Sequence, residues 1–142
     1  MGWLEKDLVE SLESLNSLFR KNYIDFITEK PRAVSIGERE FTLYTLEELV
    51  ATVTIDGLEV SNIRALKGYV KTIKEFLGPN TMDQKGNKFS MLMLAASKVI
   101  GHDNGDLLFI DGHDSKTIYI FHPDGGDLTK TKLKLNSLIK NG

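Results

Sequence analysis

The sequence has no cysteine, and it has only three prolines and one tryptophan in 142 residues. The absence of cysteine excludes disulfides, thiolate nucleophiles, zinc fingers and iron–sulfur clusters, and it fits a reducing compartment. No apolar run reaches the ~18–20 residues that a membrane-spanning helix needs, and the N-terminal residues do not follow the pattern of an export signal. We therefore expect a cytoplasmic protein that makes no use of a membrane.

An excess of basic residues is also missing. The chain has 18 Lys and Arg against 20 Asp and Glu, a formal net charge of −2. Proteins that bind nucleic acid through its phosphates are usually basic, so we expect no direct nucleic-acid partner. The length suits one ordinary domain, and the sequence contains no internal repeat, low-complexity tract or linker. A single domain over residues 1–142 is the prediction.

The spacing of apolar residues predicts helices mainly in the first part of the chain. An amphipathic pattern runs from Leu4 to Phe19, and a second short one covers residues 23–27. Thr45, with Glu48 three residues later, has the pattern of a capping box for a turn of helix to Val50. A longer helical pattern follows over residues 63–77 and stops at Gly78-Pro79.

β-Branched and aromatic residues predict strands, and most of these lie late in the chain. Residues 33–36 and 41–44 are expected to form a hairpin, and residues 107–110 and 117–121 an antiparallel pair. Residues 51–58 suit a strand that Asp56-Gly57 cuts short, and residues 89–96 fit a buried strand as well as a helix. The last amphipathic segment should cover an edge or face of the sheet with Leu133, Leu135, Leu138 and Ile139. Together these elements predict an α+β fold.

A family resemblance rests on two adjacent segments. Val99 to Asp111 joins a small apolar stretch and a Gly-rich turn ending in Gly105-Asp106 to an apolar strand ending in Asp, and Ile118 to Asp124 adds a strand with aromatics followed by His. This arrangement resembles the SUKH superfamily, which unites fungal regulators of cell-wall and glucan synthesis with bacterial immunity proteins. The order of the preceding elements is similar too, although the family's Leu-Pro and Asn-Gly-Gly around its Tyr-containing helix are absent.

The resemblance implies an α+β domain with a twisted antiparallel sheet and helices packed against it. It also implies a protein-binding scaffold without enzymatic activity or cofactor. In bacteria such proteins commonly neutralise secreted polymorphic toxins, many of them nucleases, by binding them. The residues of the shared motif to which we assign a structural role are Gly101, Gly105, Asp106 and Asp111.

Histidines and acids crowd the last third of the chain, which raises an alternative. His102, His113 and His122 alternate with aspartates, and imidazole with carboxylate can bind zinc, iron or manganese. A metal-dependent hydrolase is therefore one candidate function. The sequence has no His-x-x-x-His, His-Glu-x-x-His or Gly-x-Ser-x-Gly pattern, however, and Asp and Gly are ordinary residues of tight turns. We favour turn structure, with no metal and no catalytic residue.

Charge is segregated along the same region. From Asp103 to Asp127 there are six acids and one lysine, whereas residues 128–142 have four lysines and no acid. Such an acidic run can steer a basic partner, and it is also typical of a solvated edge. Strand alternation puts Tyr119 and Phe121 on one face, either as an exposed patch or as core. The candidate partner-binding residues are Asp103, Asp106, Asp111, Asp114, Tyr119, Phe121, Asp124 and Asp127.

These patterns lead to one functional interpretation and two alternatives. The favoured interpretation is a cytoplasmic, non-enzymatic immunity protein that binds and neutralises a basic toxin, such as a nuclease, by occlusion. The first alternative is a regulatory scaffold like the fungal members of the SUKH superfamily. The second is the metal-dependent hydrolase that uses the His/Asp cluster.

Overall fold

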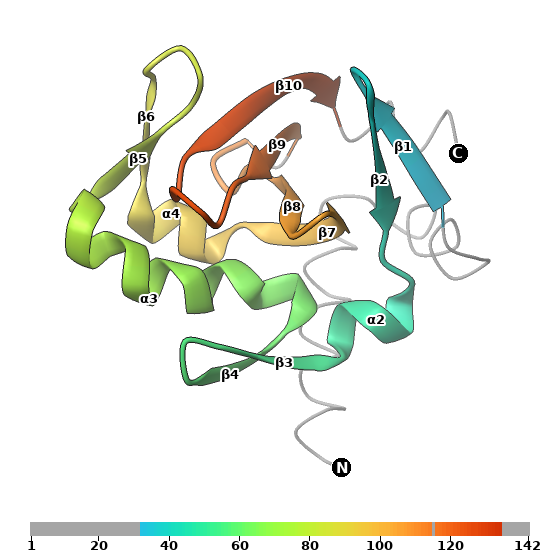
Figure 1. Cartoon of the computed structure of the whole chain (residues 1–142), viewed down its shortest axis with the longest axis horizontal. Coiled ribbons are helices and arrows are strands. Elements are labelled where there is room, and N and C mark those ends of the chain that lie inside the picture. The colour runs from blue at the N-terminus through green and yellow to red at the C-terminus, as the bar shows by residue number, and fades with distance from the viewer. Residues whose placement is uncertain (1–31, 115, 135–142) are drawn as a thin grey trace.

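The structure is a computed structural model that describes residues 32–114 and 116–134. The helices predicted within residues 1–31 and the apolar residues Leu135, Leu138 and Ile139 lie outside the described residues. In the described part, a six-stranded antiparallel sheet curls around part of the core, with helices and two small hairpins beside it (Figure 1). The predicted α+β class, with a twisted antiparallel sheet and helices packed against it, is confirmed.

The main sheet has the strand order β1-β2-β7-β8-β9-β10. Every neighbouring pair in it is antiparallel. The bounds of its strands are β1 (Arg32–Ile36), β2 (Arg39–Leu43), β7 (Lys98–Asp103), β8 (Asp106–Ile110), β9 (Thr117–Phe121) and β10 (Leu128–Lys134).

The remaining elements connect β2 to β7. Strands β3 and β4 form one hairpin, and β5 and β6 form another. Helices α3 and α4 follow these hairpins and pack on one face of the main sheet (Figure 1). The bounds are α2 (Leu46–Val50), β3 (Thr52–Ile55), β4 (Leu58–Ser61), the 3-10 helix η1 (Asn62–Arg64), α3 (Ala65–Leu77), β5 (Asn80–Met82), β6 (Lys88–Ser90) and α4 (Met91–Ala96).

Several local predictions are confirmed with their physical causes. The capping box of α2 is formed, because the Glu48 N–H donates to Thr45 Oγ1 over 3.2 Å and the Thr45 N–H donates to Glu48 Oε1 over 3.0 Å. Helix α3 ends at Gly78, which has a φ of 81°. Residues 89–96, whose sequence fits either a strand or a helix, form one after the other. They finish β6 and then enter α4, where the Ser90 hydroxyl caps the helix by accepting from the Met93 N–H.

The two faces of the main sheet bury two different apolar clusters. Leu108, Ile110, Ile118 and Ile120 belong to one cluster, which also includes Leu49 of α2 and Ile63 of η1. Their neighbours along β8 and β9 belong to the second cluster, with residues of α3 and α4. In that second cluster, Tyr119 is 7% exposed and Phe121 is 0% exposed. These two aromatics are therefore core residues, which is the second of the two alternatives given above, and their listing as candidate partner-binding residues is corrected.

Strand β10 was not predicted. The sequence predicts that Leu133 belongs to a segment that covers the sheet, whereas Leu133 lies within the edge strand itself. Along β10 the lysines are exposed, and Thr129, Thr131 and Leu133 are half-buried. A strand with so few apolar residues has little signal of its own, and alternating lysines are typical of a protected sheet edge.

The turn between β7 and β8 has the conformation expected of a two-residue hairpin. Asn104 and Gly105 have φ angles of 49° and 87°. Asn-Gly is a favoured pair for such a turn because asparagine tolerates positive φ and glycine adopts it without steric cost. The prediction that Gly105 occupies a conformation that other residues disfavour is therefore confirmed.

We expect Gly105→Val to lower the free energy of unfolding by about 1–3 kcal/mol through backbone strain. A Cβ on Gly105 would meet nothing within 4 Å, so the expected loss comes from the backbone and not from a clash. Urea unfolding of the variant measures it. Gly105→Asn is the matched control, since asparagine tolerates positive φ and should lose less. Equal stability of the valine variant and the wild type would contradict this explanation of the turn.

Within the described residues, no helix combines the length and apolar character required to cross a membrane.

Candidate partner-binding site

Three connections of the main sheet lie at one end because the strands alternate in direction. These are the β1–β2 turn, the β7–β8 turn and the β9–β10 connection. Residues 37–40, 103–106 and 122–127 together contain six carboxylates and one guanidinium, a formal charge of −5 with histidine neutral. We call this surface the acidic end. Its acids are Glu38, Glu40, Asp103, Asp106, Asp124 and Asp127.

The acids between Asp103 and Asp127 therefore do not form one continuous edge in the structure. Asp111 and Asp114 lie in the β8–β9 connection, at the opposite end of the sheet. Glu38 and Glu40, which were not among the predicted site residues, lie at the acidic end instead. The correction follows from the antiparallel order of the strands, since consecutive connections of a meander alternate between the two ends of a sheet.

Arg39 is the centre of the acidic end. Its Nε donates to Asp103 Oδ2 over 2.9 Å, and its Nη1 donates to Asp106 Oδ2 over 2.8 Å. A third bond, from Nη2 to the Asp103 carbonyl oxygen, measures 3.0 Å. The guanidinium also lies 4.7 Å from the centre of the Phe41 ring. The hydrogen bond to Asp106, supported by Asp103, raises the pKa of Arg39 although burial opposes it.

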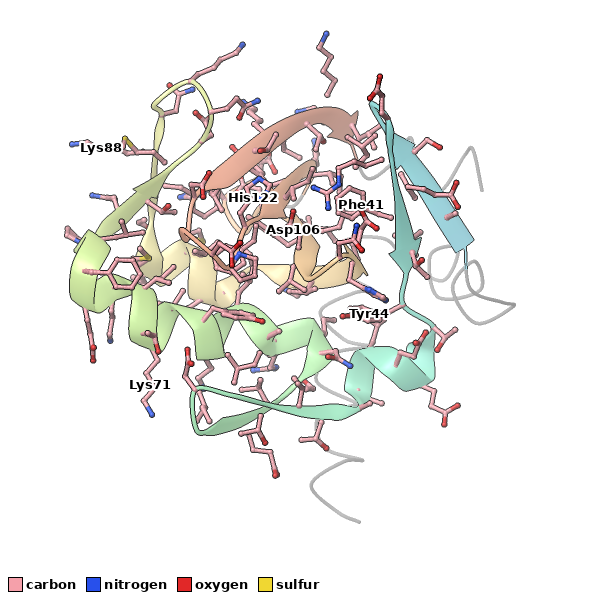
Figure 2. All side chains as sticks on the ribbon, in the orientation of Figure 1. Phe41, Tyr44, Lys71, Lys88, Asp106 and His122 are labelled. Carbon is pink, nitrogen blue, oxygen red and sulfur yellow. The ribbon has the colours of Figure 1, made fainter. Side chains whose placement is uncertain are left out.

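His122 extends this network to the next two strands. Its Nδ1 lies 3.0 Å from Asp106 Oδ2, and its Nε2 lies 2.7 Å from Thr129 Oγ1. Asp106 and His122 are seen together inside the curve of the sheet in Figure 2. One Asp106 oxygen thus joins β2 to the end of β9. The prediction that Asp106 ties its turn to backbone donors is corrected, because its carboxylate contacts the side chains of Arg39 and His122.

The network separates two kinds of acid at the acidic end. Asp103 and Asp106 are partly buried and paired with Arg39, so they hold β2, β7 and β8 in place. Charge-assisted hydrogen bonds of this kind are about twice as strong as neutral ones. The remaining four acids are exposed and face solvent, where a partner could meet them: Glu38, Glu40, Asp124 and Asp127.

The role of Arg39 cannot be read from the sequence. This residue is a single base between two glutamates at the start of β2, and no local pattern connects it to carboxylates 64 and 67 residues later. The usable signal would have been electrostatic, since half-buried aspartates require a cation or hydrogen-bond donors nearby. Only the pairing of β2 with β7 brings that cation to them.

At the opposite end, the aspartates form the β8–β9 connection. Asp111 Oδ1 accepts from the His113 N–H over 2.8 Å and lies 2.7 Å from His113 Nδ1. Asp114 Oδ1 accepts from the N–H groups of Lys116 and Thr117. Burial alone would raise the pKa of Asp114, but these bonds and the Thr117 hydroxyl outweigh it and lower the pKa. Both aspartates have the turn chemistry expected of them.

The three histidines do not meet. His102 stacks on Tyr44 with 5.0 Å between ring centres, and His113 packs edge-on against Phe89 at 4.9 Å. His122 belongs to the Arg39 network. Among residues 32–114 and 116–134, no three His, Asp or Glu side chains are placed to hold a metal ion.

Comparisons of the chain with models of protein families, with curated proteins and with solved structures found no match. The function must therefore be inferred from the residues and their geometry.

Proposed function

We propose that this chain is a SUKH-type immunity protein that binds a basic polymorphic toxin through the acidic end and neutralises it. The observation that carries the proposal is the convergence of three connections that gives this end a formal charge of −5 in a chain whose net charge is −2. The motif from Val99 to Asp124, which carries the SUKH resemblance, supplies two of these connections. The family resemblance and the charged surface thus point to the same part of the molecule.

The mechanism is steering followed by occlusion. A surface of one sign attracts an oppositely charged partner and raises the association rate, with an effect that salt screens. Toxins that cut nucleic acid must bind phosphates, so their active sites are typically lined by Lys and Arg. The exposed acids at the acidic end would pair with these groups and cover them. No bond is made or broken by the immunity protein itself, and we place it in the cytoplasm with its target.

Of the two alternatives, only the metal-dependent hydrolase finds less support in the geometry. A regulatory scaffold would use the same surface for a different basic protein and differs only in the partner. A metal-dependent hydrolase would need the histidines to converge, whereas His102, His113 and His122 each have separate neighbours.

The experiment that tests the proposal uses the gene immediately upstream. Its product is expressed in a host cell with and without this chain, and growth is followed. We expect the product to arrest growth alone, and co-expression to restore growth and yield a stable complex on size-exclusion chromatography. A product that is toxic, remains toxic on co-expression and forms no complex would contradict the proposal. A stable complex with a harmless product would favour the regulatory scaffold.

A further inference from the structure

A pocket of about 220 Å³ opens beside the β7–β8 turn. Gly105 of that turn contributes to its wall, so the pocket adjoins the acidic end. The aromatic side chains that line it are Tyr44, Tyr69 and His102, and the apolar ones include Val53, Ile55 and Leu107. Pockets for drug-sized ligands span about 300–1,000 Å³, so this smaller pocket suits a single long side chain.

The aromatic rings of the pocket are held in place by their neighbours. Tyr44 follows β2 and stacks on His102 of β7, with 5.0 Å between ring centres and an interplanar angle of 29°. Tyr69 of α3 packs against the buried Phe121 ring at 5.2 Å. Rings fixed in this way lose little freedom when a ligand binds between them, which favours affinity.

Each of the two phenols is influenced by one carboxylate. Burial raises the pKa of Tyr44 to about 12, and the Glu48 carboxylate adds to the shift, followed by Tyr69. Burial also raises the pKa of Tyr69, with a further contribution from the Asp56 carboxylate. Both phenols therefore stay neutral at physiological pH. The described residues that line the pocket include no lysine or arginine.

We propose that this pocket receives an arginine or lysine side chain that projects from the protein bound at the acidic end. The apolar wall suits the aliphatic stem of such a side chain, and the faces of aromatic rings attract a cation within about 6 Å. The Glu48 carboxylate, which acts on Tyr44, and the Asp56 carboxylate, which acts on Tyr69, favour positive charge beside these rings and disfavour an acid. This inference rests on the proposed function for the source of the side chain, but not for the chemistry of the pocket.

The chemistry is tested without any toxin. The full chain is titrated with N-acetyl-arginine methylamide and, separately, with the citrulline analogue, which has nearly the same shape but no charge. Amide NMR signals report the binding. We expect the arginine compound to shift signals of Tyr44, Tyr69, His102 and Gly105, and the citrulline compound to bind at least about fivefold more weakly. Equal binding of the two compounds, or shifts confined to other parts of the chain, would overturn the proposal.

Two substitutions remove the carboxylates that act on the phenols and preserve the local backbone structure. Glu48→Gln keeps the capping box, since glutamine can replace glutamate at this position. Asp56 has a φ of 51°, and Asp56→Asn retains a residue that tolerates this conformation. We expect this double variant to bind the arginine compound about three- to tenfold more weakly. The control Glu47→Gln/Glu59→Gln removes two exposed charges that do not contribute to the pKa shifts of Tyr44 and Tyr69, and it should bind like the wild type.

The outcomes distinguish this inference from the proposed function. If the double variant binds the arginine compound as the wild type does, the pocket proposal is wrong, whatever the toxin experiment shows. If arginine binds in the pocket and is weakened by the double variant, the proposal about its chemistry is supported even where the upstream product fails to bind. A complex with the toxin that is weakened by Tyr69→Leu then supports the partner as the source of the side chain.

Discussion

Replacing Gly101 with valine is expected to lower the free energy of unfolding by about 3 kcal/mol or more. Gly101 is buried in β7, opposite Leu43 of β2. A Cβ atom at this position would lie 2.7 Å from the Thr42 carbonyl oxygen and 3.3 Å from the Leu43 Cα. Because these are backbone atoms of the neighbouring strand, relief requires β2 to move away from β7. The register between these two strands includes only Thr42 with His102 and Leu43 with Gly101.

The same movement should disturb the acidic end. Arg39 lies on β2, and its aspartate partners lie on the far side of this strand junction. Urea unfolding of Gly101→Val measures the loss of stability. Gly125→Ala is the control, because its Cβ would approach only the Asp127 carboxylate, which can rotate away. A valine variant as stable as the alanine control would show that β2 and β7 are not packed as closely as described.

Charge reversal at the acidic end is expected to have the second large effect. The double variant Asp124→Lys/Asp127→Lys should slow association with the basic toxin by about tenfold or more at low salt. Both residues are exposed, and neither side chain takes part in the hydrogen bonds of Arg39 and His122 with the aspartates. The fold should therefore be retained. The difference should shrink as salt is added, because the Debye length falls to about 8 Å at physiological ionic strength. Stopped-flow or surface-based kinetics over a salt series measures these rates.

A control with the same change of net charge makes the result specific. Glu59→Lys/Glu75→Lys alters two exposed acids on β4 and α3, away from the acidic end. If this control slows association as much as Asp124→Lys/Asp127→Lys does, net charge governs the rate and the acidic end has no special role. If neither variant slows it at low salt, the toxin binds elsewhere.

Local features of the fold could be predicted from the sequence because their causes are local. The capping box at Thr45, the end of α3 at Gly78 and the Gly105 turn each depend on a few adjacent residues. The run 89–96 could not be assigned to one class because it changes from strand to helix at Ser90, and its apolar pattern suits both.

The candidate site was less predictable because it depends on strand pairing. Counting charge along the chain grouped Asp103 with Asp114, but the antiparallel meander sends them to opposite ends of the sheet. It also brings Arg39 to Asp106, which lies 67 residues away. Tyr119 and Phe121 could be assigned to core or surface only once the packing of α3 and α4 on their face was known. Contacts between residues so distant in sequence leave no periodic pattern of apolar or charged residues from which they could be predicted.

Amide hydrogen exchange of the full chain, with and without the purified upstream toxin, tests the binding surface most directly. Binding should slow exchange in the three connections of the acidic end, residues 37–40, 103–106 and 122–127, and leave the β8–β9 connection near Asp111 and Asp114 unchanged. Slower exchange around Asp111 and Asp114, with no change at the acidic end, would contradict the proposal that this chain holds its partner there.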